Sequence, residues 1–134
     1  MVNYTYSFVV QEADLDSFGH LNNAVYLRLY EQARWDLITK NGYGLKKIKE
    51  SGLGPTLLET KIVFLKELKE RDEVVIESQM VTYERKVGKM VQKMVRGEEV
   101  CSEAEFTIGL FDTKLRKLVL PTPEWLQAVG FNTV

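Results

Sequence analysis

The residues best suited to chemistry gather in one short segment, residues 14–23, which reads DLDSFGHLNN. It holds two carboxylates (Asp14 and Asp16), the chain's one histidine (His20) and two asparagines, directly before a predicted helix. A helix start presents backbone N–H groups without intrahelical partners and a partial positive charge. A carboxylate there could activate water or attack a carbonyl carbon, while the first amides of the helix hold the developing oxyanion. Asp and Asn are also ordinary turn residues, so a purely structural role stays open.

The other reactive residue types narrow the choice of chemistry. A zinc site needs several His or Cys ligands together, whereas the chain has one histidine and one cysteine, Cys101. Carboxylate-only sites for hard cations stay open. A triad of Ser17, His20 and an Asp is not expected, because three residues of one short loop rarely reach triad geometry. Cys101 is expected to be a small buried hydrophobe in a strand, and Met80, Met90 and Met94 are expected in the core. We therefore expect catalysis by carboxylates, hydroxyls or backbone amides, with no cofactor.

The loop is predicted to lie between a strand and a long helix. Residues 4–10 alternate between polar and apolar side chains, which is typical of a strand. An apolar stripe with helical spacing then runs over residues 23–40 and consists of Tyr26, Leu29, Tyr30, Ala33 and Leu37. Asn22 is the expected N-cap, and Asn41-Gly42 is the expected end of the helix.

Strand patterns dominate the rest of the chain. The expected elements are a short helix at 45–51, strands at 57–65, 73–83, 89–96 and 100–110, a turn at 85–88, a short strand near 117–120 and a helical turn near 124–129. One long helix across the apolar face of one antiparallel sheet makes an α+β fold. The open edges of such a sheet favour dimerisation.

Length and composition set the broad class of the protein. Domains usually contain ~100–150 residues, so the 134 residues (1–134) are expected to form a single domain. With 18 basic and 19 acidic residues the formal net charge is −1, which does not favour nucleic-acid binding. The start of the chain lacks a signal-peptide pattern, and no segment reaches the ~20 apolar residues of a membrane helix. With a single cysteine and no leader, a cytoplasmic protein without a membrane partner is expected.

A more specific pattern covers residues 14–34. It reads Asp-x-Asp-x-x-Gly-His-x-Asn-Asn, then x-x-Tyr, then Glu-x-Ala-Arg within the helix. The matching residues are Asp14, Asp16, Gly19, His20, Asn22, Asn23, Tyr26, Glu31, Ala33 and Arg34. In this pattern the chain resembles the hotdog-fold acyl-CoA thioesterases of the 4-hydroxybenzoyl-CoA thioesterase-like family. Weaker agreement extends the resemblance over nearly the whole chain.

The resemblance implies a fold, an assembly and a catalytic group. The fold is the hotdog, a five-stranded antiparallel sheet wrapped around one long central helix, in a homodimer or homotetramer with active sites between protomers. Asp16 falls on the family's catalytic carboxylate, acting as general base or nucleophile. The backbone amide of Asn23 falls on the group that polarises the thioester carbonyl. Some relatives carry a histidine at the position of Asn23; His20 is not a direct substitute, and its role stays open.

The resemblance also suggests where the substrate binds. CoA commonly lies along the sheet and hairpin near the dimer interface in such folds. By analogy Gly88 and Lys89 contact pantetheine, and Arg85 or Lys86 the phosphates, although a solvated hairpin tip is the simpler interpretation of these charges. For the acyl group, Phe18, Tyr26 and Trp35 suit an apolar pocket that accepts aliphatic chains or aryl groups. The candidate substrate contacts are therefore Phe18, Tyr26, Arg85, Lys86, Gly88 and Lys89.

The sequence therefore predicts an acyl-CoA thioester hydrolase that yields the free acid and CoA. Plant acyl-carrier-protein thioesterases share a similar Gln-His-x-Asn-Asn run, so an acyl-carrier protein (ACP) is an alternative carrier. A hotdog hydratase would need its own acid–base pair, and none is evident. A non-catalytic acyl-CoA-binding module would keep the cleft and the dimer but would not need Asp16.

Overall fold

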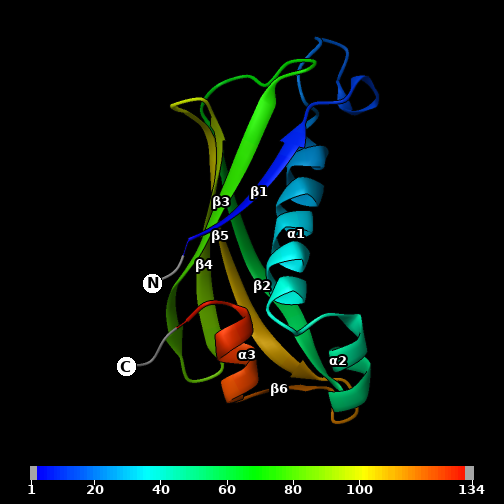
Figure 1. The fold of residues 1–134 in the computed structure, drawn as a ribbon, viewed down its shortest axis with the longest axis vertical. Helices are drawn as coiled ribbons and strands as arrows, with labels where there is room; N and C mark the ends of the chain where they lie inside the picture. The colour runs from blue at the N-terminus through cyan, green and yellow to red at the C-terminus, as the bar shows by residue number, and fades with distance from the viewer. Residues whose placement is uncertain (1–2, 132–134) are drawn as a thin grey trace.

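A long helix lies along one face of a twisted antiparallel sheet in the computed structural model, which describes residues 3–131 (Figure 1). The strands are β1 (Tyr4–Val9), β2 (Leu53–Phe64), β3 (Glu73–Glu84), β4 (Val87–Arg96), β5 (Glu99–Asp112) and β6 (Lys117–Val119). The helices are α1 (Asn23–Lys40), α2 (Leu45–Ser51) and α3 (Pro123–Ala128), with a 3₁₀ turn, η1 (Glu12–Asp14), after β1. The α+β layout expected from the sequence is confirmed.

The sheet has two long edge strands. Its order is β1-β3-β4-β5-β2, every neighbouring pair is antiparallel, and the short β6 adds to β5 beyond the end of β4. The edges are therefore β1 and β2. In the sequence, α1 and the loop before it lie between β1 and β2. In space, the start of α1 lies at one end of the sheet (Figure 1).

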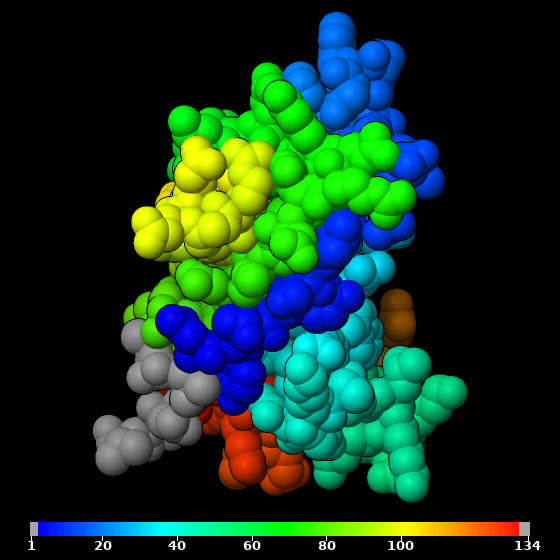
Figure 2. Space-filling view, turned by 45° about the horizontal axis from the view of Figure 1, so that its top comes forward, coloured from blue at the N-terminus to red at the C-terminus, as the bar shows by residue number. Residues whose placement is uncertain are grey.

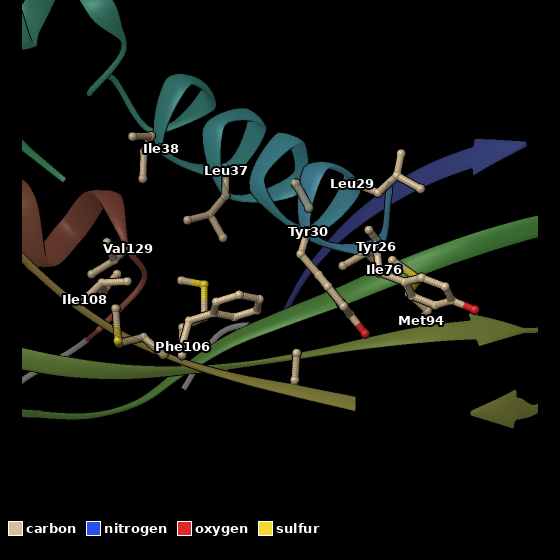
Figure 3. Close-up of a cluster of buried hydrophobic side chains, with 14 of the residues drawn as sticks. Tyr26, Leu29, Tyr30, Leu37, Ile38, Ile76, Met94, Phe106, Ile108 and Val129 are labelled. Atoms are coloured by element: carbon tan, nitrogen blue, oxygen red, sulfur yellow. The ribbon is translucent and has the colours of Figure 1, made fainter. Parts of the chain in front are cut away.

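Helix α1 spans the predicted residues because its ends are marked locally. The Asn22 side chain accepts a hydrogen bond from the Ala24 N–H at 2.9 Å, which confirms the predicted N-cap. The predicted apolar stripe is buried, and Ile38 joins it (Figure 3); its residues are Tyr26, Leu29, Tyr30, Ala33, Leu37 and Ile38. With this face turned to the sheet, the helix start is fixed relative to the strands.

The sheet contributes the other half of the core. The three methionines predicted as core residues, Met80, Met90 and Met94, are fully buried, and so is Cys101. The polar side chains between helix and sheet are paired: the Tyr30 hydroxyl donates to Ser102 Oγ at 2.8 Å. Such pairing removes most of the cost of burying polar groups.

The start of β2 differs from the prediction. The strand begins at Leu53, four residues before the predicted residue 57, and runs through Gly54 and Pro55. Proline has no N–H to donate, but an edge strand accepts it when that position faces away from its partner. Gly54 is needed for packing, because a Cβ there would lie 2.9 Å from Ile48 Cγ2 of α2. The Gly-Pro pair that reads as a breaker is thus part of an edge strand.

The two ends of the molecule are distinct. Figure 2 shows the blue segment that precedes α1 at one end and the red α3 near the other. At the α3 end Trp125 packs on Tyr43 and donates its indole N–H to the Tyr83 hydroxyl at 3.0 Å. Among residues 3–131 no helix is long and apolar enough to span a membrane.

Candidate active site

Asp16 is held by the backbone of its own loop. Its Oδ1 accepts hydrogen bonds from the N–H groups of Phe18 at 2.9 Å and His20 at 3.1 Å. Its own N–H donates to the His20 carbonyl at 2.8 Å. Gly19, at φ +80°, allows the tight turn that these bonds require. The structural interpretation of Asp16 thus holds for one oxygen, while Oδ2 has no hydrogen-bond partner within residues 3–131.

Asp16 lines a pocket between the start of α1 and the end of β2. The lining residues are Asp16, His20, Leu21, Asn23, Tyr26, Phe64, Leu65, Lys66 and Glu67. The two walls are joined by the Leu21 N–H, which donates to the Leu68 carbonyl at 2.8 Å. The structure therefore brings the candidate site residues Asp16, His20, Asn23 and Tyr26 together in one pocket.

The backbone N–H of Asn23 is available to a ligand. It is the first residue of α1, so it has no intrahelical acceptor. The neighbouring donors are occupied: the Asn22 N–H donates to the Asp14 carbonyl, and the Ala24 N–H to the Asn22 side chain. Across the described residues 3–131, the Asn23 N–H has no acceptor. It stands at the positive end of the helix, beside Asp16 in the pocket.

His20 and Tyr26 differ in how free they are to act. The His20 Nε2 pairs with Glu67 Oε2 at 3.1 Å, which orients the imidazole. The Tyr26 ring packs edge-on against Phe64, and burial raises the pKa of Tyr26 to about 12. Its phenol therefore stays protonated at neutral pH. Its hydroxyl has no acceptor among residues 3–131 and can donate a hydrogen bond to a group in the pocket.

Two residues of the loop lie outside this pocket lining. Asp14 forms an ion pair with Arg28 at 2.7 Å, and its carbonyl receives the Asn22 N–H, so it fixes the loop onto α1. Phe18, a predicted contact of the acyl group, is 82% exposed at the loop tip and does not line the pocket.

The predicted CoA contacts lie at the opposite end of the protomer. Arg85 and Lys86 form the turn between β3 and β4, and the 12 residues of β3 extend about 36 Å from the loop end to that turn. Gly88 is buried and packs closely on Tyr83, since a Cβ at this position would lie 2.5 Å from the Tyr83 ring. Lys89 Nζ pairs with Glu105 at 3.1 Å. One protomer alone does not bring these residues to Asp16.

The β2 wall of the pocket was not predicted from the sequence. Phe64 and Glu67 come near Asp16 through tertiary contacts: the bridge between His20 and Lys69, the Leu21 hydrogen bond, the His20–Glu67 pair and the packing of Phe64 on Tyr26. No local pattern encodes such a contact between segments so far apart. Within the part of the chain that the structure describes, no cluster of three or more His, Cys, Asp or Glu could hold a metal ion.

Comparison with known proteins places this chain in a family. The sequence model of the thioesterase-like superfamily matches residues 10–129. No curated protein sequence matches the chain.

Solved structures share the fold at low identity. The YbaW probable thioesterase of Escherichia coli is 23% identical with a TM-score of 0.84, over 94% of this chain and 98% of that one. A hypothetical protein of Staphylococcus aureus in complex with CoA is 15% identical with a TM-score of 0.89, over 99% and 88%. A 1,4-dihydroxy-2-naphthoyl-CoA thioesterase of Synechocystis is 17% identical with a TM-score of 0.85, over 96% of each chain. With the family model covering nearly the whole chain, the protein belongs to the thioesterase-like superfamily and is a hotdog-fold thioester hydrolase.

Proposed function

We propose that residues 1–134 act as one acyl-CoA thioesterase domain, with Asp16 as the catalytic carboxylate and the Asn23 N–H as the oxyanion donor. One observation carries the proposal: a carboxylate oxygen and a backbone N–H, both without a partner in residues 3–131, line the same pocket. The fixed Oδ1 of Asp16 sets the direction of its free oxygen. A thioester carbonyl between the two groups would have its carbon near the carboxylate and its oxygen at the helix start.

In the general-base route, Asp16 removes a proton from water and the water oxygen bonds to the carbonyl carbon. The carbonyl oxygen becomes an oxyanion, which accepts a hydrogen bond from the Asn23 N–H. The Tyr26 hydroxyl is a second candidate donor. The C–S bond then breaks, the thiolate takes the proton from Asp16, and the free acid leaves. In the nucleophile route, Asp16 displaces the thiolate to form a mixed anhydride, which water hydrolyses. The free oxygen serves either route.

A second copy of the chain would complete the site through the edge of β2. Within residues 3–131 this edge has no strand partner. It carries apolar side chains that are 41–49% exposed, namely Leu57, Leu58, Val63 and Phe64, with Leu65 directly after. An unpaired apolar edge is a template for strand pairing. Antiparallel pairing of two β2 strands about a two-fold axis turns the partner end for end. The partner's turn between β3 and β4 would then lie toward the Asp16 end of this protomer.

This geometry supports the proposed role of Arg85 and Lys86 for CoA phosphates across the dimer. Both are exposed. Lys89 also lies on this hairpin, but its ammonium group is already paired with Glu105. Gly88 allows the backbone to pack closely on Tyr83, so it presents little open surface to a ligand. The presence of CoA in a protein of the same fold supports CoA as the carrier.

The oligomer is tested by matched changes on the two sheet edges. Val63 on β2 and Val9 on β1 are almost equally exposed, at 41% and 40%. We expect a homodimer or homotetramer in sedimentation equilibrium, and Val63→Lys to dissociate the β2 contact and lower activity, because a lysine opposes edge pairing. Val9→Lys should preserve the β2 dimer. A wild-type monomer at micromolar concentration would contradict a shared site.

The activity is tested by thiol release from a panel of CoA esters with aliphatic chains of increasing length and with aryl groups. The same acyl groups on an acyl-carrier protein and on pantetheine identify the carrier. We expect turnover of CoA esters that disappears in Asp16→Asn while the ester still binds. Binding without turnover of any ester by the wild-type protein would favour the non-catalytic module, and preference for the carrier protein would favour the ACP thioesterase.

A further inference from the structure

A second cavity, separate from the Asp16 pocket, lies between the C-terminal half of α1, β2, β5 and α3. It measures about 110 Å³, and its lining includes Glu31, Arg34, Trp35, Ile38, Ile108 and Trp125. Figure 3 shows Ile38 on the helix above Ile108 and Val129. Pockets for drug-sized ligands usually measure ~300–1,000 Å³, so this cavity suits a compact group. Its walls are mostly aromatic and aliphatic.

One cation stands in this apolar wall. The Arg34 guanidinium lies 4.2 Å from the centre of the Phe106 ring, and its Nη1 donates to Gln92 Oε1 at 3.0 Å. The Gln92 amide donates its own hydrogens to the Tyr30 carbonyl and to Ser78 Oγ, so its oxygen must face Arg34.

The hydrogen-bond and ring contacts of Arg34 within residues 3–131 are with neutral groups, and the nearest negative charge on the cavity wall is Glu31. Within residues 3–131 no Asp or Glu forms an ion pair with Arg34. Glu31, one turn earlier on α1, lines the cavity but is exposed and makes no ion pair with the guanidinium. Burial lowers the pKa of Arg34 to about 10, which still leaves it charged at neutral pH. A guanidinium has five N–H donors in a planar fork that matches a carboxylate, and one of them is used here.

We propose that this cavity binds a compact carboxylate, whose apolar body lies against the aromatic and aliphatic walls and whose oxygens accept hydrogen bonds from Arg34. Such a ligand has two sources. One is the far end of an acyl group that carries a carboxylate away from its thioester, and the other is a free carboxylic acid. The binding site itself does not depend on the proposed hydrolysis at Asp16; only the first source does.

Calorimetry on the full chain tests the site with benzoate and hexanoate against benzamide and hexanamide. The amides keep the apolar body and lose the charge. We expect a carboxylate to bind at least about tenfold more tightly than its amide, and Arg34→Met to remove that difference. A carboxylate is ionised and offers two oxygens to the guanidinium fork, whereas the neutral amide offers one. Equal binding of acid and amide, or no binding of either carboxylate, would overturn the proposal.

Three further variants keep this test decisive if Arg34→Met fails to fold. Arg34→Lys retains the charge and should retain the preference for carboxylates. Glu31→Gln leaves the contact with Gln92 intact and removes a negative charge from the cavity wall, so it should tighten carboxylate binding. Arg116 also lies over a phenylalanine ring, Phe111, at 5.2 Å, but outside the cavity. Arg116→Met should change nothing, and carboxylate binding that is insensitive to Arg34 and Glu31 would assign Arg34 a purely structural role.

The source of the carboxylate is tested separately. Binding of the free acids is measured in the Asp16→Asn protein, so that a failure of the hydrolase proposal leaves this result unaffected. Hydrolysis by the wild-type protein is then compared between CoA esters that end in a carboxylate and esters of equal length that end in a methyl group. A preference for the carboxylate esters that Arg34→Met abolishes identifies the substrate as the source. Inhibition by the free acids that Arg34→Met relieves identifies the free acid.

Discussion

The two ends of helix α1 hold their polar groups in place by different means. At the N-terminal end, Asp16 is fixed by backbone hydrogen bonds within a loop of a few residues, and its pocket is open to solvent on the side of Phe64. In the C-terminal half, Arg34 is fixed by packing against Phe106 and by one bond to the buried Gln92.

This difference predicts how the two regions respond to substitution. A change at the loop end that preserves the backbone bonds should alter chemistry without altering the free energy of unfolding. A change under the helix alters packing as well, because core positions respond to the loss of even small groups. The following variants separate the two kinds of response, in order of expected effect.

The largest of these effects is expected for Asn23→Pro. Proline is tolerated at the first helical position, and Asn22 before it already has φ −64° and ψ 139°, which a residue before proline prefers. The fold should survive while the oxyanion donor is lost, which lowers kcat by about 10²–10³. Asn23→Ala keeps the N–H and should be much milder. Equal losses in both variants, or a loss of thermal stability in place of activity, would assign the residue to the fold.

Tyr26 and Tyr30, one helical turn apart, offer a sharper contrast. Tyr26 lines the pocket, and its hydroxyl has no hydrogen-bond acceptor within residues 3–131. Tyr26→Phe should therefore lower kcat about tenfold, which corresponds to one hydrogen bond of roughly 1.4 kcal/mol, with little change in melting temperature. The Tyr30 hydroxyl donates to the buried Ser102, so Tyr30→Phe should destabilise the fold by about 1–3 kcal/mol with kcat preserved per folded molecule. Kinetics and thermal melts on both variants measure the split; the reverse pattern would contradict it.

The smallest effect is expected at the far end of the protomer. Exposed charge pairs contribute about 0.2–1 kcal/mol, so Arg85→Ala and Lys86→Ala should each raise KM for CoA esters by a few-fold at most. Esters of pantetheine, which lack the phosphates, should be unaffected. Lys46→Ala and Lys49→Ala on α2 are the controls, since both lysines are exposed and lie on another element. Unchanged KM for both carriers would show that the hairpin charges are only a solvated surface.

The parts of the molecule that the sequence predicted well are those with local signals. The span of α1 and its buried stripe follow from the Asn22 cap and the 3.6-residue period, and Met80, Met90 and Met94 are in the core as expected. The β3–β4 turn was also predicted, because polar residues there interrupt two alternating runs.

The parts that were missed depend on contacts between distant segments. Glu67 reaches His20 only after the chain has passed through α1, α2 and β2. The contacts of Arg34 under the helix depend on which side chains of β4 and β5 lie opposite it, here Gln92 and Phe106. Phe18 was expected in the pocket because an aromatic side chain suits an apolar acyl site, but the bonds that fix Asp16 leave it at the loop tip.

The most direct test of the account compares Asp16→Asn with Asp16→Ala in kcat and in melting temperature. Asparagine keeps an oxygen that can accept the N–H groups of Phe18 and His20, so the loop should remain folded while the charged group is lost. We expect kcat for the preferred thioester to fall by about 10²–10⁴ in both variants, and the melting temperature to fall only in Asp16→Ala. Near-normal turnover by a folded Asp16→Asn protein would show that Asp16 caps the loop and does not perform the chemistry.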